Sequence, residues 1–128
     1  KAGGRVWLDA DIRIDYTPRG SVRSLARQYF NYGKGRAKNL HKHKARLKLR
    51  QSAPISILAL CLAGLVGGLF QWQALLLPVG YLSVLAGASA AIALKHKSAC
   101  GLLAGVAAGT MHMAWAAGFT WESVAGKR

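Results

Sequence analysis

Few side chains in this sequence could perform chemistry, and acids are the scarcest among them. The 128 residues include only four acids, Asp9, Asp11, Asp15 and Glu122. No two of them are placed as a general acid and base, and no acidic cluster suits a divalent metal. P-loop, G-x-G-x-x-G, H-E-x-x-H and G-x-S-x-G motifs are also missing. We therefore interpret the aspartates as solvated positions and predict neither a catalytic residue nor a metal ligand in this chain.

The thiols and one imidazole lie within apolar runs. Cys61 and Cys100 have neither CxxC spacing nor neighbouring ligands, so buried thiols are favoured over a metal or redox site. An ionisable residue such as His112 inside an apolar segment is a functional hypothesis by default. We nevertheless favour a neutral imidazole that is hydrogen-bonded to a neighbouring helix.

Basic residues dominate the front of the chain. The net charge is +14, nearly all Lys and Arg precede Gln51, and residues 33–50 hold the densest run without one acid. Such a run can bind nucleic acid. Here it ends where an apolar segment begins, which is the pattern of a cytoplasmic membrane flank. We therefore predict no nucleic-acid partner and expect attraction to anionic lipid of on the order of 1 kcal/mol per basic side chain.

A strand and a helix are predicted before and within this basic region. Alternating polar and apolar residues from Asp11 to Tyr16 predict a half-buried strand. A single strand cannot fold alone, so its sheet is expected upstream and residues 1–19 would be the remnant of a larger domain. Ser21 is a plausible N-cap for an amphipathic helix, and residues 20–52 are predicted to lie at the membrane interface. A surface helix packed on the missing domain is the alternative. The apolar stripe of this helix consists of Val22, Leu25, Ala26, Tyr29 and Phe30.

Three apolar segments follow, at about 54–72, 74–94 and 99–119, before a polar tail at 122–128. Each is long enough to cross a hydrocarbon core of roughly 30 Å as a helix. The flank before the first segment and the loop at 95–97 are both basic, which predicts that both are cytoplasmic. The first two segments would then cross the membrane and return, and the third would cross again and leave the C-terminus in the periplasm. A third segment that re-enters instead of crossing is the alternative. The predicted fold class is therefore mainly α and membrane-embedded.

Small residues are predicted to mark the helix-packing faces, because glycines spaced by four let helix backbones approach closely in lipid. Whether these faces pack within one chain or between chains is left open by the sequence. The predicted packing residues are Gly64, Gly68, Gly101, Gly105 and Gly109.

Three segments carry a resemblance to a known family. They are the predicted strand, the stretch RQYFNYGKGRAK at residues 27–38 and, more loosely, MHMAWAAGFTW at 111–121. These segments resemble the C-terminal region of membrane-bound family 2 glycosyltransferases, in particular the succinoglycan and exopolysaccharide glucosyltransferase branch. The resemblance implies an upstream GT-A domain with a metal-associated DxD motif and a later Glu-Asp motif that supplies the base. A divalent Mg or Mn ion would be bound by that domain. We expect no cofactor in this chain, and we expect the chain to be part of a longer enzyme.

Many processive members of that family carry Gln-x-x-Arg-Trp on an interface helix, where it contacts acceptor and pyrophosphate. Gln28 matches this motif, Tyr32 replaces the Trp, and Asn31 replaces the Arg and so lacks the charge that would pair with phosphate. Neighbouring basic residues could supply that charge, and contact with lipid headgroups is the open alternative. The candidate binding residues are Arg27, Gln28, Tyr32, Lys34 and Arg36.

The leading hypothesis from the sequence is the membrane-anchoring, acceptor-side part of a glycosyltransferase in the bacterial inner membrane. The full enzyme would transfer sugar from a nucleotide-sugar donor to a lipid-linked or polysaccharide acceptor, and membrane lipids would be partners of this part. The alternative is a small non-enzymatic membrane protein with a basic lipid-binding collar. The sequence leaves the donor, the acceptor and the oligomeric state open.

Overall fold

A computed structural model describes residues 3–4, 7, 9, 11–13, 15 and 20–126. Over these residues the chain consists of four α-helices and two short 3-10 segments. None of the described positions before Gly20 is in a strand. Ile14 and Tyr16 of the predicted strand lie outside the described residues, so that strand stays a prediction.

The amphipathic helix is α1, Val22–Lys42, and it is longer than its apolar stripe predicted. It begins as expected, because the Ser21 hydroxyl accepts a hydrogen bond from the Ser24 amide at 3.2 Å. The stripe continues through Gly33, Ala37 and Leu40, which are all buried. Helical spacing places the basic residues on the other faces. The basic run is helical up to Lys42, residues 43–48 connect α1 to the next helix, and that helix begins at Leu49.

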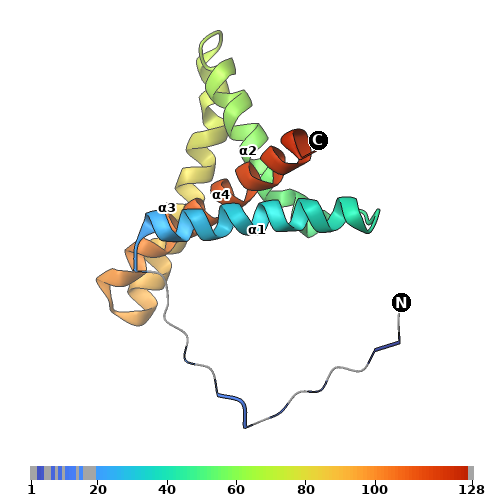
Figure 1. Ribbon diagram of the computed structural model, residues 1–128. Coiled ribbons are helices and arrows are strands. Elements are labelled where there is room, and N and C mark those ends of the chain that lie inside the picture. The colour runs from blue at the N-terminus through green and yellow to red at the C-terminus, as the bar shows by residue number, and fades with distance from the viewer. Residues whose placement is uncertain are drawn as a thin grey trace.

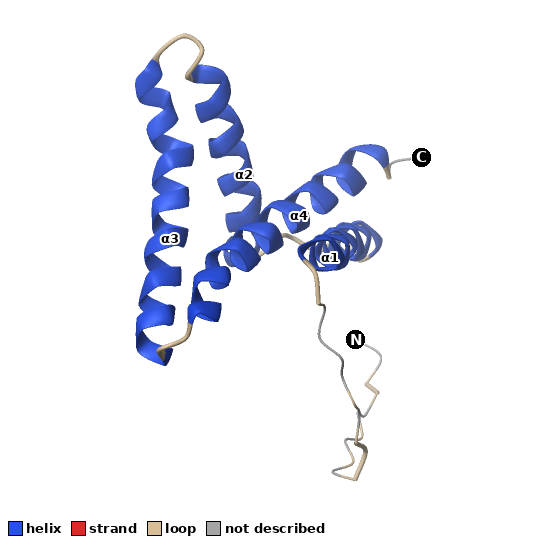
Figure 2. Ribbon diagram, turned by 90° about the vertical axis from the view of Figure 1, so that its left-hand side faces the viewer, coloured by secondary structure: helices blue, strands red, loops and turns tan. Residues whose placement is uncertain are grey.

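Two antiparallel apolar helices form a hairpin that rises from α1 (Figure 1). They are α2, Leu49–Gly67, and α3, Leu76–His96, and the short segment η1, Trp72–Leu75, joins them at the tip. Figure 2 shows the hairpin from the side with α1 end-on, so that α1 runs across its base. The hairpin closes tightly because Gly64 and Gly68 have no Cβ. A Cβ at Gly64 would overlap Ala74 and Pro78, and one at Gly68 would overlap Leu75.

The last helix, α4, Leu103–Ala125, begins at the foot of α3 after the short segment η2, Ala99–Leu102. Lys97 turns the chain between them with a left-handed backbone, φ 48°. Instead of rising beside the hairpin, α4 leans away from it towards α1 (Figure 2). Its C-terminal half therefore lies against α1 and not against the hairpin tip.

Two segments are long and apolar enough to cross a membrane, Trp72–His96 and Ala99–Ala125. The apolar part of α2, Gln51–Gly67, is shorter, so three spans are not established. Large apolar side chains on the hairpin are exposed, among them Val84 at 70% and Leu69 at 82%. Helices that are apolar all round and unburied are suited to lipid and not to water.

Candidate functional site

The α1 helix separates its side chains into three groups by helical spacing. Phe30, Gly33 and Ala37 face α4. On one flank of this stripe Tyr32 and Arg36 follow one another at i and i+4, whereas Lys34 and Lys38 occupy the opposite flank. The two flanks therefore have different surroundings, although both belong to the same basic run.

The crossing of α1 and α4 is built on a glycine from each helix. A Cβ at Gly33 would overlap the Trp115 carbonyl oxygen and the Phe119 amide of α4. A Cβ at Gly118 would likewise overlap the Phe30 carbonyl of α1. Because the obstacles are backbone atoms, no side-chain rearrangement can relieve them. The two glycines thus set how closely the basic helix sits on the last apolar helix.

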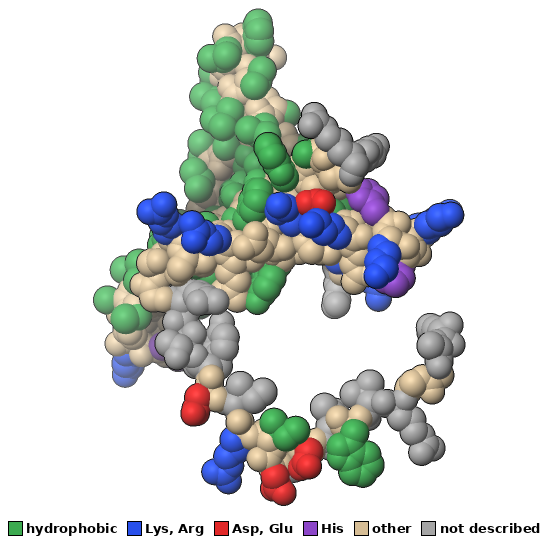
Figure 3. Space-filling view, viewed as in Figure 1, with side chains coloured by type: hydrophobic (Ala, Val, Ile, Leu, Met, Phe, Trp, Pro, Cys, Tyr) green, Lys and Arg blue, Asp and Glu red, His purple; other side chains and the backbone are tan. Residues whose placement is uncertain are grey.

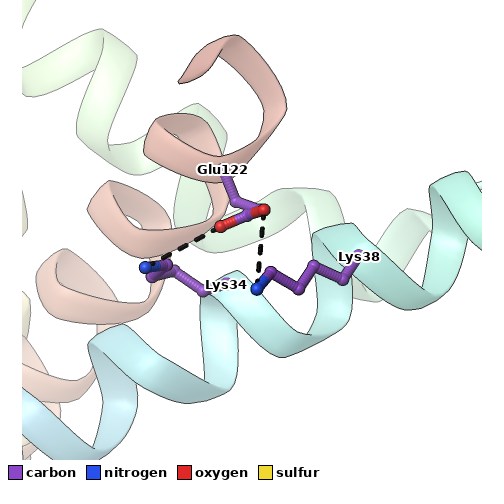
Figure 4. A network of polar contacts seen from close by, with 3 residues as sticks. All are labelled: Lys34, Lys38 and Glu122. Carbon is purple, nitrogen blue, oxygen red and sulfur yellow. Dashed lines mark ion pairs between the residues drawn. The ribbon is translucent and has the colours of Figure 1, made fainter. Parts of the chain in front are cut away.

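One flank of this crossing carries an ion-pair cluster on Glu122 (Figure 4). The Glu122 carboxylate lies 3.8 Å from Lys34 Nζ and 3.9 Å from Lys38 Nζ. Only 12% of its side chain is exposed, compared with 66% for that of Lys38. A carboxylate buried to this degree requires charged partners. The cluster therefore adds a polar contact between the end of α4 and the middle of α1.

A first hollow of about 560 Å³ lies along the N-terminal half of α1. Gln28 and Tyr32 border it, and the Gln28 side-chain amide donates a hydrogen bond to the Tyr32 hydroxyl at 2.7 Å. Asn31 and Arg27 border it as well, so the position that lacks the expected arginine has a guanidinium four residues earlier. The described residues that line the hollow are Ser21, Arg23, Ser24, Arg27, Gln28, Asn31 and Tyr32.

A second hollow, of about 580 Å³, lies where α1, α2 and α4 meet. At its polar end Arg36 Nη2 donates to Gln51 Oε1 at 2.9 Å, which ties α1 to the first turn of α2. The Arg36 Nε atom is buried and has no hydrogen-bond partner among the described residues. Leaving such a donor unmatched costs about 1–3 kcal/mol or more. The described residues that line this hollow are Tyr29, Tyr32, Arg36, Gln51, Pro54, Met111, His112 and Trp115.

The five predicted binding residues are thus divided between three places. Arg27 and Gln28 share the first hollow, Arg36 lines the second, and Tyr32 borders both. Lys34 lies in neither hollow and instead forms an ion pair with Glu122.

Three residues of the site were not predicted from the sequence: Glu122 as a partner of α1, and Gln51 and Trp115 as lining residues of the second hollow. The signal for Glu122 was present, since it is the one acid that follows the basic run. For Gln51 and Trp115 no local pattern indicates a shared hollow, because it forms only where three helices meet.

Polar residues within the apolar helices form hydrogen bonds between those helices. Tyr81 of α3 and His112 of α4 are hydrogen-bonded at 3.0 Å between the hydroxyl and Nδ1, which confirms the predicted bond from His112 to a neighbouring helix. Buried Ser89 accepts a hydrogen bond from the Gly105 amide at 2.7 Å and donates one to the Leu85 carbonyl at 2.8 Å. The Tyr81–His112 and Ser89–Gly105 bonds join α3 to α4 near the glycine stripe, whereas the Ser89–Leu85 bond lies within α3.

That stripe is packed within the chain. A Cβ at Gly101 would overlap Ala93, and one at Gly105 would overlap Leu85 and Ser89. Gly109 also faces α3, at Leu85. This side of α4 therefore packs on α3 of the same chain.

No group of three metal-ligating side chains occurs among the described residues. Asp9 and Asp11 have D-x-D spacing, but the Asp9 carboxylate accepts a hydrogen bond from the Asp11 amide at 3.0 Å, as in a local turn. Nothing in the described part of the chain adds a third ligand to this pair.

The surface divides sharply by side-chain type (Figure 3). Lys and Arg side chains follow α1, whereas hydrophobic side chains cover the hairpin above it. Basic side chains along a helix at the base of an apolar hairpin are suited to anionic headgroups at a membrane surface.

These features, a basic helix held at the base of an apolar hairpin, accompany a sequence similar to membrane-associated glycosyltransferases of exopolysaccharide synthesis. The chain is 40% identical over 123 residues to the succinoglycan biosynthesis protein ExoA of Rhizobium meliloti (strain 1021), a family 2 glycosyltransferase. The match covers 95% of this chain and 37% of that relative. The resemblance stated from the sequence is therefore confirmed. No family model matches the chain, and no solved structure matches it.

Proposed function

We propose that this chain is the membrane-anchoring, acceptor-side part of a family 2 glycosyltransferase. The enzyme would transfer a sugar from a nucleotide-sugar donor to a lipid-linked or polysaccharide acceptor. The observation that carries the proposal is the similarity to ExoA over 95% of the chain, which includes the basic helix and the apolar helices together. The chain spans only 37% of that relative, so the catalytic groups would belong to a part of the enzyme outside these 128 residues.

The role of α1 in this proposal is to hold a catalytic domain against the cytoplasmic leaflet. Arg27, Gln28 and Tyr32 line a hollow near the start of the helix, close to where a preceding domain would adjoin it. A guanidinium, an amide and a phenol can together bind the hydroxyl and phosphate oxygens of a sugar-bearing acceptor. A divalent Mg or Mn and the donor would be bound by the upstream domain.

For orientation, we propose that α1 and the loop at 95–97 lie on the cytoplasmic side of the inner membrane. The hairpin tip at Trp72 would then face the periplasm. The Glu122 ion pairs argue against a full crossing by the last segment, because they hold the end of α4 beside α1. The C-terminus would accordingly return to the cytoplasmic interface instead of reaching the periplasm.

The test begins with the coding DNA upstream of Lys1 and continues with membranes from cells that express the whole reading frame. Membranes are incubated with sugar-labelled nucleotide hexoses and Mg or Mn, and label in the lipid extract is measured. The proposal expects an upstream frame with DxD and Glu-Asp motifs and metal-dependent labelling of lipid. A start codon close to Lys1, with no labelled lipid, would instead leave the non-enzymatic membrane protein with a basic collar.

A further inference from the structure

We propose that the second hollow, between α1, α2 and α4, binds the phosphate group of a membrane lipid, with Arg36 as its cationic ligand. The inference deepens the proposed function and rests on it only in placing α1 at a membrane surface. It concerns a different set of residues from the first hollow, with Tyr32 as the one residue in common.

The guanidinium of Arg36 still has donors to offer. One of its amino groups is bonded to Gln51, and the buried Nε has no partner among the described residues. A guanidinium presents five N–H donors in a planar fork that matches two oxygens of a phosphate. A small shift of the side chain into the hollow would give both Nε and an amino group an anionic acceptor.

The surroundings favour an anion over a cation. No acid is among the described residues that line the hollow. Glu122, the one acid within the described helices, is held on the opposite flank of α1 by Lys34 and Lys38, so it leaves the charge of Arg36 unneutralised. Gln51 belongs to the first turn of α2, where the helix dipole is positive and attracts a phosphate.

The other walls fit the chain of a lipid. Pro54, Met111 and Trp115 supply apolar surface beside the charged end, and Tyr29 adds an aromatic face. The hollow lies where the apolar run of α2 starts, which is the depth at which lipid phosphates meet hydrocarbon. A free phosphate would leave this apolar wall uncovered, whereas a phosphate that carries a hydrocarbon chain would fill both ends.

The experiment measures lipid binding to the purified whole protein in detergent by native mass spectrometry. Three probes are compared: polyprenyl phosphate, the uncharged polyprenol of the same length, and phosphatidylglycerol. Arg36→Gln should raise the half-saturating concentration of the phosphate-bearing lipids by about tenfold. Lys42→Gln removes the same charge from the same helix but away from both hollows, and should change it less than about twofold.

A second variant tests the same hollow while leaving Arg36 in place, so that a local change of fold at Arg36 cannot explain both results. Met111→Trp adds bulk to the opposite wall without changing charge, and should reduce binding of the phosphate-bearing lipids as strongly as Arg36→Gln. The proposal is overturned if polyprenol binds as well as its phosphate, if Arg36→Gln and Lys42→Gln act equally, or if Met111→Trp binds like the wild type.

The probes also separate the possible sources of the phosphate. Stronger binding of polyprenyl phosphate assigns the hollow to a lipid carrier, whereas equal binding of phosphatidylglycerol assigns it to a resident membrane lipid, and both support the site. Binding is measured without a sugar donor. Loss of sugar transfer with retained lipid binding would therefore contradict the proposed function alone, and the reverse would contradict only this inference.

Discussion

Gly33 of α1 and Gly118 of α4 lie at one helix crossing, each against the backbone of the other helix. They come from opposite ends of the described chain, and neither belongs to the glycine spacings that predicted the packing faces. Their contact places a strongly basic helix directly on an apolar one. The stability of the whole arrangement should therefore depend on this crossing and on the polar contacts around it.

Gly33→Ala should destabilise the docking of α1 by about 1–3 kcal/mol, because its Cβ would overlap backbone atoms of Trp115 and Phe119. Gly35→Ala is the matched control. Nothing lies within 4 Å of a Cβ at that position, so the change should stabilise the helix by about 0.5–1 kcal/mol. Unfolding by denaturant in detergent, followed by circular dichroism, measures both. Equal effects of the two variants would show that α1 is not packed on α4 at Gly33.

Glu122→Gln should weaken the contact between α1 and α4 by about 1 kcal/mol or less, because its ion pairs are long and Lys38 is largely exposed. The Lys34→Gln, Lys38→Gln double variant should lose more, because it leaves the largely buried Glu122 carboxylate without a cation. Combining all three substitutions should add little, since the interaction is then already gone. Additive losses in this cycle would contradict the ion-pair assignment. Added salt should also reduce the difference between wild type and variant.

Tyr81→Phe should cost roughly 0.6 kcal/mol and at most about 2, which is the range for hydrogen bonds between membrane helices. The change removes only the hydroxyl that is bonded to His112. A cycle with His112→Phe, measured by unfolding in mixed detergent micelles, isolates the pair. No coupling energy between the two substitutions would mean that the bond does not form.

Gln28→Ala and Lys34→Gln should separate binding from anchoring. Under the proposed function, Gln28→Ala removes a side chain from the first hollow and should lower sugar transfer by about tenfold with unchanged stability. Lys34→Gln should instead lower stability slightly and leave transfer by the remaining folded protein unchanged, because Lys34 faces Glu122. Transfer assays and unfolding curves on the same preparations decide this. The opposite pattern would return Lys34 to the acceptor site.

Under the proposed orientation, a cysteine placed at Val124 should react with membrane-impermeant maleimide only after the cytoplasmic side is opened. Val124 is 75% exposed, and Glu122, two residues earlier, is held against α1. A cysteine at Trp72, at the hairpin tip, should react in intact spheroplasts. Both are made in a background with Cys61 and Cys100 replaced. Labelling of position 124 in intact spheroplasts would restore the full crossing that the loop charges first suggested.

The sequence predicted the elements that local pattern determines. The Ser21 cap, the apolar stripe of α1 and the run of apolar helices each follow from residue type and spacing over a few turns. The interhelical bond of His112 was predictable too, because a polar group in an apolar segment needs a partner.

The sequence did not predict what depends on how the helices meet. Nothing local shows that α4 leans towards α1, so the roles of Gly118 and Glu122 were missed. The separation of Lys34 from Arg36 was missed for the same reason, since only the position of α4 decides which flank each residue occupies. The helix that covers the first apolar segment ends at Gly67, where the hairpin turn begins.

The contact between the first and last helices has a consequence for biosynthesis. As the chain is made from its N-terminus, α1 leaves the ribosome before the hairpin and well before α4. Until Gly118 and Glu122 have been translated, the surface on which α1 docks does not exist. A domain attached ahead of α1 would therefore reach its working position only once synthesis of the membrane part is complete, and a chain that ends before α4 would leave α1 undocked.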